Sequence, residues 1–310
     1  MSDDTRTLGI IGVGRMGAAM WHHLRAQGHT AVVFDTNDAA AAALVAQGAP
    51  TAPSAGAVAT QASVIICSLP RSDDVADALL GPAGVAGAAG PDTLVIDTTS
   101  GAPSRSQEIA ADCIARGFGY VDAGVSGGVH GAATGALNIM VGGGDDDVAT
   151  ARPVLELLGQ QIWHCGPVGT GHAMKTVLNL ANQAKMLVEI EALLVGRSAG
   201  LDAHQMADVL GLGTWRHFLM GPDGRERFGF SLEMSCKDYA VGIGVAEEGD
   251  VPVRTLAAAH NTMHSILDVV GPDADLVDYV QVLEHDAGVE LPNHGHEGGH
   301  DHHQPEGSDA

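Results

Sequence analysis

The sequence predicts an α/β fold in which a doubly wound sheet is followed by an all-helical C-terminal domain. Short apolar runs alternate with helical segments in the first half of the chain, which is typical of a parallel sheet covered on both faces. A glycine-rich turn separates the first apolar run from the first helical segment. After residue 166 the pattern becomes helical throughout, so we place the domain boundary there.

The expected strands are short apolar runs bounded by Gly, Pro or polar residues, as buried strands are. They cover residues 8–11, 31–34, 64–69, 93–96, 120–122, 137–142 and 161–164. Amphipathic or alanine-rich segments predict helices over 16–27, 38–47 and 145–158. From about 171 to 200, apolar positions recur at helical spacing without a proline, which predicts one long helix. The expected domains are therefore 1–166 and 167–291, with a tail over 292–310.

The tail contains Gly, Asp, Glu, Pro and five histidines and has no apolar periodicity. Such a segment cannot bury enough apolar surface to fold, so we expect a disordered, acidic, His-rich tail. Opportunistic binding of Zn, Cu or Ni by its imidazoles is the alternative. We predict no metal site among the functional residues of the two domains.

Composition excludes several classes of partner. The net charge of −23 repels phosphate backbones and anionic membranes, and aromatics at 4% are too few for a base-stacking surface. We therefore expect neither nucleic acid nor membrane as a partner. The four cysteines form no CxxC pair, and the N-terminus lacks the layout of a signal peptide. A cytoplasmic protein with reduced thiols is expected.

The first predicted strand runs into a G-x-G-x-x-G sequence, Gly12-Val13-Gly14-Arg15-Met16-Gly17. Between a strand and a helix, these glycines give a tight turn, backbone access for a pyrophosphate and close helix packing. The helix N-terminus then offers N–H groups and positive partial charge to the phosphates. This context favours a Rossmann-type dinucleotide-binding domain over a plain strand-to-helix turn.

Asp35 follows the second predicted strand, 18 residues after the last glycine of the loop. A carboxylate at this place accepts hydrogen bonds from the adenosine ribose hydroxyls and repels a 2′-phosphate. No Arg or Lys occurs between Arg25 and Arg71 to receive such a phosphate. The sequence therefore favours NAD over NADP.

Lys175 and Asn179 lie four residues apart near the start of the long predicted helix, and so share one face. The helix dipole disfavours a lysine there, and this field together with partial burial lowers a lysine pKa toward the range of an acid/base catalyst. From spacing alone, an exposed surface lysine is the commoner explanation of this pattern. Upstream, Ser126-Gly127-Gly128 offers a hydroxyl and consecutive N–H groups that suit a carboxylate. An ordinary flexible turn is the alternative.

Together these segments resemble the β-hydroxyacid dehydrogenase family, which includes 3-hydroxyisobutyrate dehydrogenase and tartronate semialdehyde reductase. The resemblance runs from about residue 8 to 291. It includes the G-x-G-x-M-G loop, a D-A-P-V-S-G-G segment in which Gly124 replaces Pro, and a G-x-G-x-x-x-K-x-x-N-N segment in which Leu178 replaces the first Asn. A later Lys237-Asp238 pair, preceded by Phe230 and Leu232, also matches.

The resemblance implies an NAD-dependent enzyme that transfers hydride between nicotinamide and a small 3-hydroxy acid. Lys175 is then the general acid/base, Asn179 assists, and Ser126, Gly127 and Gly128 hold the substrate carboxylate. The residues expected beside the dinucleotide, besides the glycine loop and Asp35, are Leu69, Pro70, Thr99, Ser100 and Lys237. The helical domain is expected to carry substrate and oligomer contacts, as a homodimer or homotetramer.

Two alternatives remain at this stage. A semialdehyde or imine reductase of the same superfamily would use NAD(P)H, although such imine reductases generally lack the lysine and favour NADPH. A non-catalytic NAD-binding sensor would share the fold without turnover. Substrate choice is expected to depend on residues 214–218, where Arg216 or His217 could bind an anionic group and Trp215 and Phe218 could equally be core aromatics.

Overall fold

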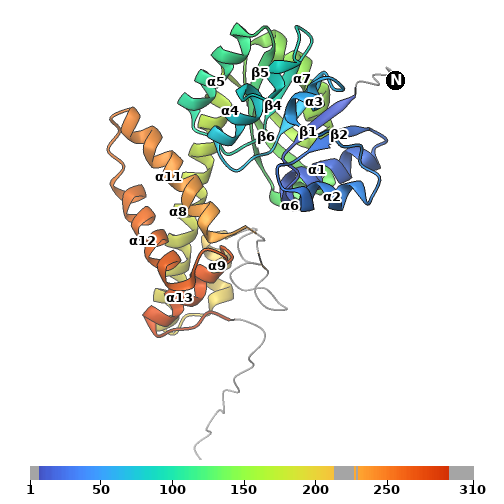
Figure 1. The fold of residues 1–310 in the computed structure, drawn as a ribbon. Helices are drawn as coiled ribbons and strands as arrows, with labels where there is room; N and C mark the ends of the chain where they lie inside the picture. The colour runs from blue at the N-terminus through green and yellow to red at the C-terminus, as the bar shows by residue number, and fades with distance from the viewer. Residues whose placement is uncertain (1–6, 213–226, 228–229, 293–310) are drawn as a thin grey trace, which may run out of the picture. The chain divides into compact units, whose positions relative to one another are not determined.

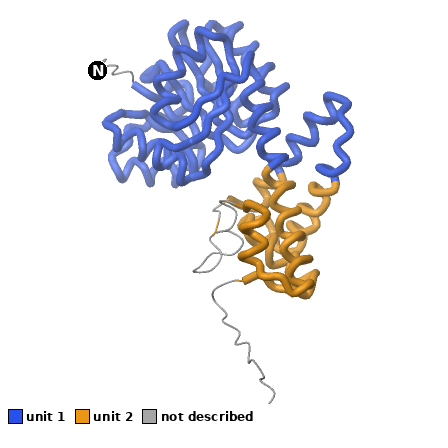
Figure 2. The backbone as a smooth tube through the Cα atoms, turned by 180° about the vertical axis from the view of Figure 1, so that it is seen from behind, with its two compact units in different colours: residues 1–181, 237–257 blue, residues 182–236, 258–310 orange. Residues whose placement is uncertain are grey.

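The computed structural model describes residues 7–212, 227 and 230–292. The chain divides into two compact units, residues 1–181 with 237–257, and residues 182–236 with 258–310 (Figure 2). Each unit has its own set of secondary-structure elements. The division falls inside the long helix α8 (Thr170–Ser198), so the start of that helix belongs with the sheet.

The first unit is built on a seven-stranded sheet with the order β2-β1-β3-β4-β5-β6-β7 (Figure 1). The strands are β1 (Leu8–Ile11), β2 (Ala31–Phe34), β3 (Val64–Cys67), β4 (Leu94–Asp97), β5 (Gly119–Ser126), β6 (Leu137–Gly142) and β7 (Gly159–Gly166). The pairs β1–β2, β1–β3, β3–β4 and β4–β5 are all parallel. The expected doubly wound α/β class is confirmed.

The sheet is mixed rather than wholly parallel, because β6 runs antiparallel to β5 and β7 is parallel to β6. Residues 127–136, which join β5 to β6, are too few for a parallel crossover, which takes a dozen or more residues. Strand β5 also extends to Ser126, four residues beyond its expected end. Residues 123–126 are thus part of the strand, because β6 pairs with their backbone.

Helices cover both faces of the sheet (Figure 1). Successive residues of a strand point to opposite faces, so Ile10 packs in one core and Ile11 in the other. This two-sided burial explains why the strands are continuously apolar. The helices of this unit are α1 (Arg15–Ala26), α2 (Asp38–Val45), α3 (Ala55–Ala59), α4 (Ser72–Leu80), α5 (Pro103–Ala115), α6 (Gly128–Thr134), α7 (Asp145–Leu158), the start of α8 and most of α11 (Leu232–Glu248), with a 3-10 turn over Val85–Gly87.

The described part of the second unit is helical. It contains the rest of α8, α9 (Ala203–Leu210), most of α12 (Arg254–Val270) and α13 (Asp278–Ala287). Its fully buried apolar side chains include Ile190, Leu193, Met263 and Tyr279. Within the described residues, no helix is long and apolar enough to cross a membrane. The four cysteines are free thiols.

A polar contact is buried between β4 and β5. The Tyr120 hydroxyl donates to Asp97 Oδ2 at 2.7 Å, while the backbone N–H of Thr99 donates to Asp97 Oδ1 at 3.0 Å. Burial raises the pKa of Tyr120, and the nearby Asp97 charge raises it further. The hydroxyl therefore stays protonated and holds the carboxylate that positions Thr99.

We predict that Tyr120→Phe lowers the free energy of unfolding by about 1–3 kcal/mol, because Asp97 Oδ2 loses a donor inside the protein. Urea unfolding followed by circular dichroism measures the change. The slope of the transition should stay that of the parent, since the same surface is exposed. A variant as stable as the parent would show that water replaces the lost donor.

Candidate active site

The chain order of the sheet places a ligand site at the carboxyl ends of β1 and β3. From β1 the chain passes to β2 on one side, and then to β3 on the other side. In open α/β sheets, ligands bind at such a reversal of strand order. The segments that follow the strand ends are residues 12–17, Asp35, Leu69-Pro70, Thr99-Ser100 and Ser126-Gly127-Gly128. The predicted cofactor residues therefore share this edge.

The glycine loop has the shape that dinucleotide binding requires. Gly12 has φ +88°, and a Cβ there would overlap the carbonyl oxygen of Ser68. A Cβ on Gly17 would overlap the carbonyl of Gly12, so α1 packs directly on the turn. At Gly14, by contrast, a Cβ would meet nothing within 4 Å. This open approach, and a helix start without a side-chain cap, fit a pyrophosphate at the N–H groups of Arg15 and its neighbours.

Asp35 is bound to the glycine loop itself. Its Oδ2 accepts from the N–H of Val13 at 2.7 Å, and its Oδ1 accepts from the N–H of Asn37 at 2.8 Å. The carboxylate is thus oriented by two backbone donors at the end of β2. Met16, the second residue of α1, is partly buried beside the core that underlies this loop.

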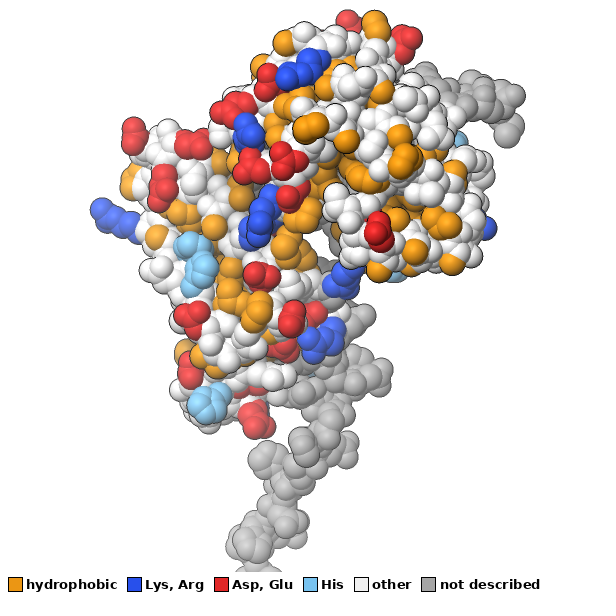
Figure 3. Space-filling model, viewed as in Figure 1, with side chains coloured by type: hydrophobic (Ala, Val, Ile, Leu, Met, Phe, Trp, Pro, Cys, Tyr) orange, Lys and Arg blue, Asp and Glu red, His pale blue; other side chains and the backbone are white. Residues whose placement is uncertain are grey.

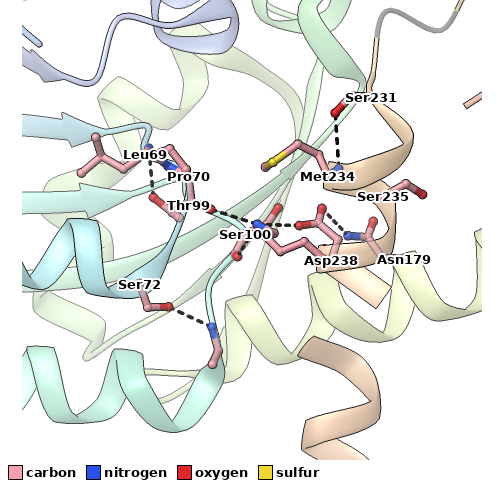
Figure 4. A network of polar contacts seen from close by, with 12 residues as sticks. Leu69, Pro70, Ser72, Thr99, Ser100, Asn179, Ser231, Met234, Ser235 and Asp238 are labelled. Atoms are coloured by element: carbon pink, nitrogen blue, oxygen red, sulfur yellow. Dashed lines mark hydrogen bonds and ion pairs between the residues drawn. The ribbon is translucent and has the colours of Figure 1, made fainter. Parts of the chain in front are cut away.

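The ends of β3 and β4 are joined by side-chain and backbone contacts (Figure 4). The N–H of Leu69 donates to Thr99 Oγ1 at 3.2 Å. Lys237 Nζ donates to the carbonyl of Pro70 at 3.0 Å and to that of Ser100 at 3.4 Å. These contacts bring together Lys237 and four other predicted cofactor residues, which are Leu69, Pro70, Thr99 and Ser100.

The start of α8 is fixed to the sheet by Asp122, which is fully buried at the end of the parallel part of β5. Its carboxylate accepts from the N–H of Gly169 and from that of His172, each at 2.7 Å. A Cβ on Gly171 would lie 2.5 Å from the Met140 carbonyl oxygen and 2.6 Å from that of Asp122. The glycine thus lets the helix start lie directly on β5 and β6.

Burial raises the pKa of Asp122, while His172 and the backbone N–H groups lower it. The His172 ring is also buried: its Nδ1 lies 2.7 Å from Ser106 Oγ and its Nε2 lies 3.2 Å from the carbonyl oxygen of Asp97. No role was predicted for Asp122. A signal was present, because an acid directly after an apolar strand opens the segment that resembles the family's substrate loop.

Lys175 lies one turn further along α8, partly buried, with its stem against β5. A Cβ on Gly124 would lie 2.5 Å from Lys175 Cβ and 3.1 Å from its Cγ. Burial lowers the pKa of Lys175; the charge of Asp238 raises it, and the charge of Lys237 lowers it. The residue is therefore not the exposed surface lysine that spacing alone allowed.

Asn179 is held by Asp238, the acid of the Lys237-Asp238 pair that matched the family pattern. Asn179 Nδ2 donates to Asp238 Oδ2 at 3.2 Å (Figure 4). The other oxygen of Asp238 forms an ion pair with Lys237 Nζ at 2.8 Å. One buried carboxylate thus links the amide on α8 to the lysine on α11, next to the ends of β3 and β4.

The predicted carboxylate cradle lies where β5 turns into α6. Ser126 ends β5 and pairs with Asn138 of β6, while Gly127 and Gly128 are exposed with φ of +125° and +61°. The turn begins two residues after Gly124, which touches the Lys175 stem. Residues 214–218, the expected source of substrate specificity, lie outside the described residues.

Two family models cover most of the chain. Residues 7–166 match the NAD-binding domain of 6-phosphogluconate dehydrogenase. Residues 169–283 match the NAD-binding domain of NADP-dependent 3-hydroxyisobutyrate dehydrogenase. The chain belongs to the β-hydroxyacid dehydrogenase family. It is accordingly an NAD(P)-dependent oxidoreductase of the hydroxyacid dehydrogenase type.

Individual relatives agree with this assignment. The 2-(hydroxymethyl)glutarate dehydrogenase of Eubacterium barkeri is 35% identical over 81% of this chain and 86% of its own length. The NAD-dependent L-serine dehydrogenase of Pseudomonas aeruginosa is 37% identical over 66% of this chain and 69% of its own. The 3-hydroxyisobutyrate dehydrogenase of Mycobacterium tuberculosis, solved with L-serine, superposes with a TM-score of 0.80 at 28% identity, covering 90% of this chain and 99% of that one. An imine reductase at 20% identity shares the fold alone.

We predict that Gly124→Ala destabilises the protein by about 1–3 kcal/mol through overpacking. The new Cβ would displace the Lys175 stem, so turnover should fall together with stability. Thermal unfolding and steady-state kinetics measure the two effects. Gly90→Ala is the matched control, since a Cβ there meets nothing within 4 Å. Equal behaviour of the two variants would contradict the predicted steric role of Gly124.

Proposed function

We propose that this protein is an NAD-dependent dehydrogenase of a small 3-hydroxy acid, with Lys175 as its general acid/base. The observation that carries the proposal is the environment of Lys175. The residue is fixed next to the nucleotide-binding edge of the sheet, and burial lowers its pKa. A lowered pKa favours the neutral amine, and a neutral amine can accept a proton from an alcohol.

A nicotinamide bound at this edge would accept the hydride from the carbon that carries the substrate hydroxyl. In the oxidation direction, neutral Lys175 accepts the proton of that hydroxyl. In the reduction direction, the Lys175 ammonium returns that proton to the carbonyl oxygen. Asn179, oriented by Asp238, is placed to donate to the reacting oxygen and keep it within reach of the amine.

The names of the relatives suggest a substrate class. 2-(Hydroxymethyl)glutarate, 3-hydroxyisobutyrate and L-serine are all 3-hydroxypropanoates with one substituent at C2. Each carries a primary alcohol two carbons from a carboxylate. We assign the carboxylate to the N–H groups and hydroxyl of Ser126, Gly127 and Gly128, and the alcohol to Lys175. The identity of the C2 substituent is left to the experiment below.

For the cofactor, Asp35 supports NAD. The Asp35 carboxylate is held by two backbone donors, so it cannot turn away from the 2′-phosphate of NADP. The two negative charges would repel each other. The sequence around Asp35 provides no arginine or lysine, since Arg25 and Arg71 are the nearest such residues on either side. Residues 1–166 would then bind the dinucleotide.

We assign substrate and oligomer contacts to residues 167–291. Helix α8 carries apolar side chains that remain exposed in the single chain: Val177 at 57%, Val188 at 57% and Val195 at 69%. Their spacings of 11 and 7 residues keep them close to one face of the helix. An apolar stripe of this kind supports a homodimer or homotetramer in which a second copy covers it.

The alternatives make different predictions. A semialdehyde reductase catalyses the same reaction in the reverse direction. It would therefore also oxidise the hydroxy acids used in the experiment described next. An imine reductase that uses NADPH is disfavoured by Asp35 and Lys175. A non-catalytic sensor would bind NAD tightly without turning over any hydroxy acid.

The deciding experiment follows NADH formation from a panel of 2-substituted 3-hydroxypropanoates. We predict that Lys175→Met lowers kcat by about 10²–10⁴-fold, the usual contribution of an acid/base group. The oxidation rate of the parent should rise with pH through a pKa below the ordinary lysine value of 10.5, because the neutral amine is the active form. Reduction should show the opposite trend.

Stability separates this role from a structural one. Because the folded-state pKa of Lys175 is lowered, the folded state binds fewer protons than the unfolded chain between the two pKa values, so the parent gains stability as pH rises through that window. Lys175→Met removes this dependence and should unfold at the parent's temperature or higher. An inactive variant that has also lost its stable fold would not support the catalytic role.

We also predict that Asp35→Ser raises the ratio of kcat/KM for NADP over that for NAD at least about tenfold, because like-charge contacts cost several kcal/mol. Kinetics with both cofactors at a fixed saturating hydroxy acid measure the ratio. Asp38→Ser, three residues along and at the first position of α2, is the control. An unchanged ratio in Asp35→Ser would exclude Asp35 as the discriminating residue.

A further inference from the structure

Two histidines on α12 face one another at the surface of the second unit. His260 and His264 are four residues apart, so they lie one turn apart on the same side of the helix. Their Nε2 atoms are 3.0 Å apart, while the ring centroids are 4.5 Å apart and the rings are inclined at 87°. The two rings therefore converge at their nitrogen ends. Histidine side chains are visible on the surface over α12 (Figure 3).

This convergence matches the bite of a chelating pair. Zinc–imidazole bonds of about 2.0–2.1 Å to two nitrogens at this separation subtend an angle of roughly 95° at the metal. That angle suits neighbouring positions in octahedral or square coordination, and it is somewhat smaller than the tetrahedral angle. Two histidines at i and i+4 also supply the paired ligands of helical zinc sites.

We propose that His260 and His264 form a bidentate surface site for a divalent transition-metal ion of the Ni²⁺, Cu²⁺ and Zn²⁺ class. Imidazole nitrogens select this class over Mg²⁺ and Ca²⁺, which prefer oxygen ligands. In the described residues, no group of three or more His, Cys, Asp or Glu side chains could hold a metal. The pair thus provides two ligands, and water fills the other positions.

Metal binding requires both Nε2 lone pairs, so the hydrogen bond between the two rings breaks when the ion binds. Without metal, one Nε2–H donates to the Nε2 lone pair of the other ring. On binding, the donating ring carries its proton on Nδ1, and both Nε2 lone pairs bind the ion. No proton is gained or lost by neutral rings. The net charge of −23 further raises the local concentration of cations around the protein.

The test must separate this pair from the tail, whose five histidines are a second source of imidazole. The starting protein is the full-length chain with His294, His296, His300, His302 and His303 replaced by Asn, which we term the tail-neutral chain. NiCl₂ is titrated into it by isothermal calorimetry. We expect one equivalent to bind and the thermal midpoint to rise, because a ligand that binds the folded state stabilises it.

His260→Asn or His264→Asn in the tail-neutral chain should weaken the binding of Ni²⁺ at least about 100-fold, since the second ligand of a chelate binds at high effective concentration. His285→Asn is the matched control, because that ring is 88% exposed on α13 and should leave the affinity unchanged. The proposal is overturned if the tail-neutral chain binds no Ni²⁺, or if both α12 variants bind as tightly as their parent.

Discussion

The architecture of the site depends on one buried carboxylate, that of Asp122, which holds the first turn of α8 against the sheet. It accepts two backbone N–H groups at the start of that helix, so it satisfies donors that every helix start leaves unpaired. The positive end of the helix dipole also favours an anion at that place. Lys175 follows three residues after the second donor, so this contact sets the height of the lysine above β5.

Close packing at two glycines also fixes the start of α8 on the sheet. Gly171 brings the backbone of α8 onto β5 and β6, and Gly124 leaves room for the Lys175 stem. At position 124 the family segment has proline, and this chain has glycine. In the structure Gly124 lies within strand β5. Because glycine has no side chain, the Lys175 stem can pack against the strand at this position. The departure from the family pattern therefore lies directly against the proposed catalytic residue.

The parts of this fold that could be predicted from sequence were those decided by local pattern. Ile10 and Ile11 are both buried, and runs of that kind indicate a sheet covered on both faces. The direction of β6 could not be taken from apolar periodicity, because parallel and antiparallel strands bury the same residues. The roles of Asp122 and Asp238 depend on partners 47 to 59 residues away, and no spacing rule identifies such partners.

An amine acts as a base only in its neutral form, so the charges around Lys175 determine whether it can serve as one. The charge of Asp238 raises the pKa of Lys175, yet the two oxygens of this carboxylate are engaged by Lys237 and Asn179. It therefore compensates the charge of Lys237 more directly than that of Lys175, and burial can lower the pKa of Lys175. Charges elsewhere on this strongly acidic chain are screened over roughly 10 Å in 0.1 M salt. The net charge of the chain therefore has little influence on the Lys175 amine, whose pKa depends on burial and on the neighbouring charges of Asp238 and Lys237.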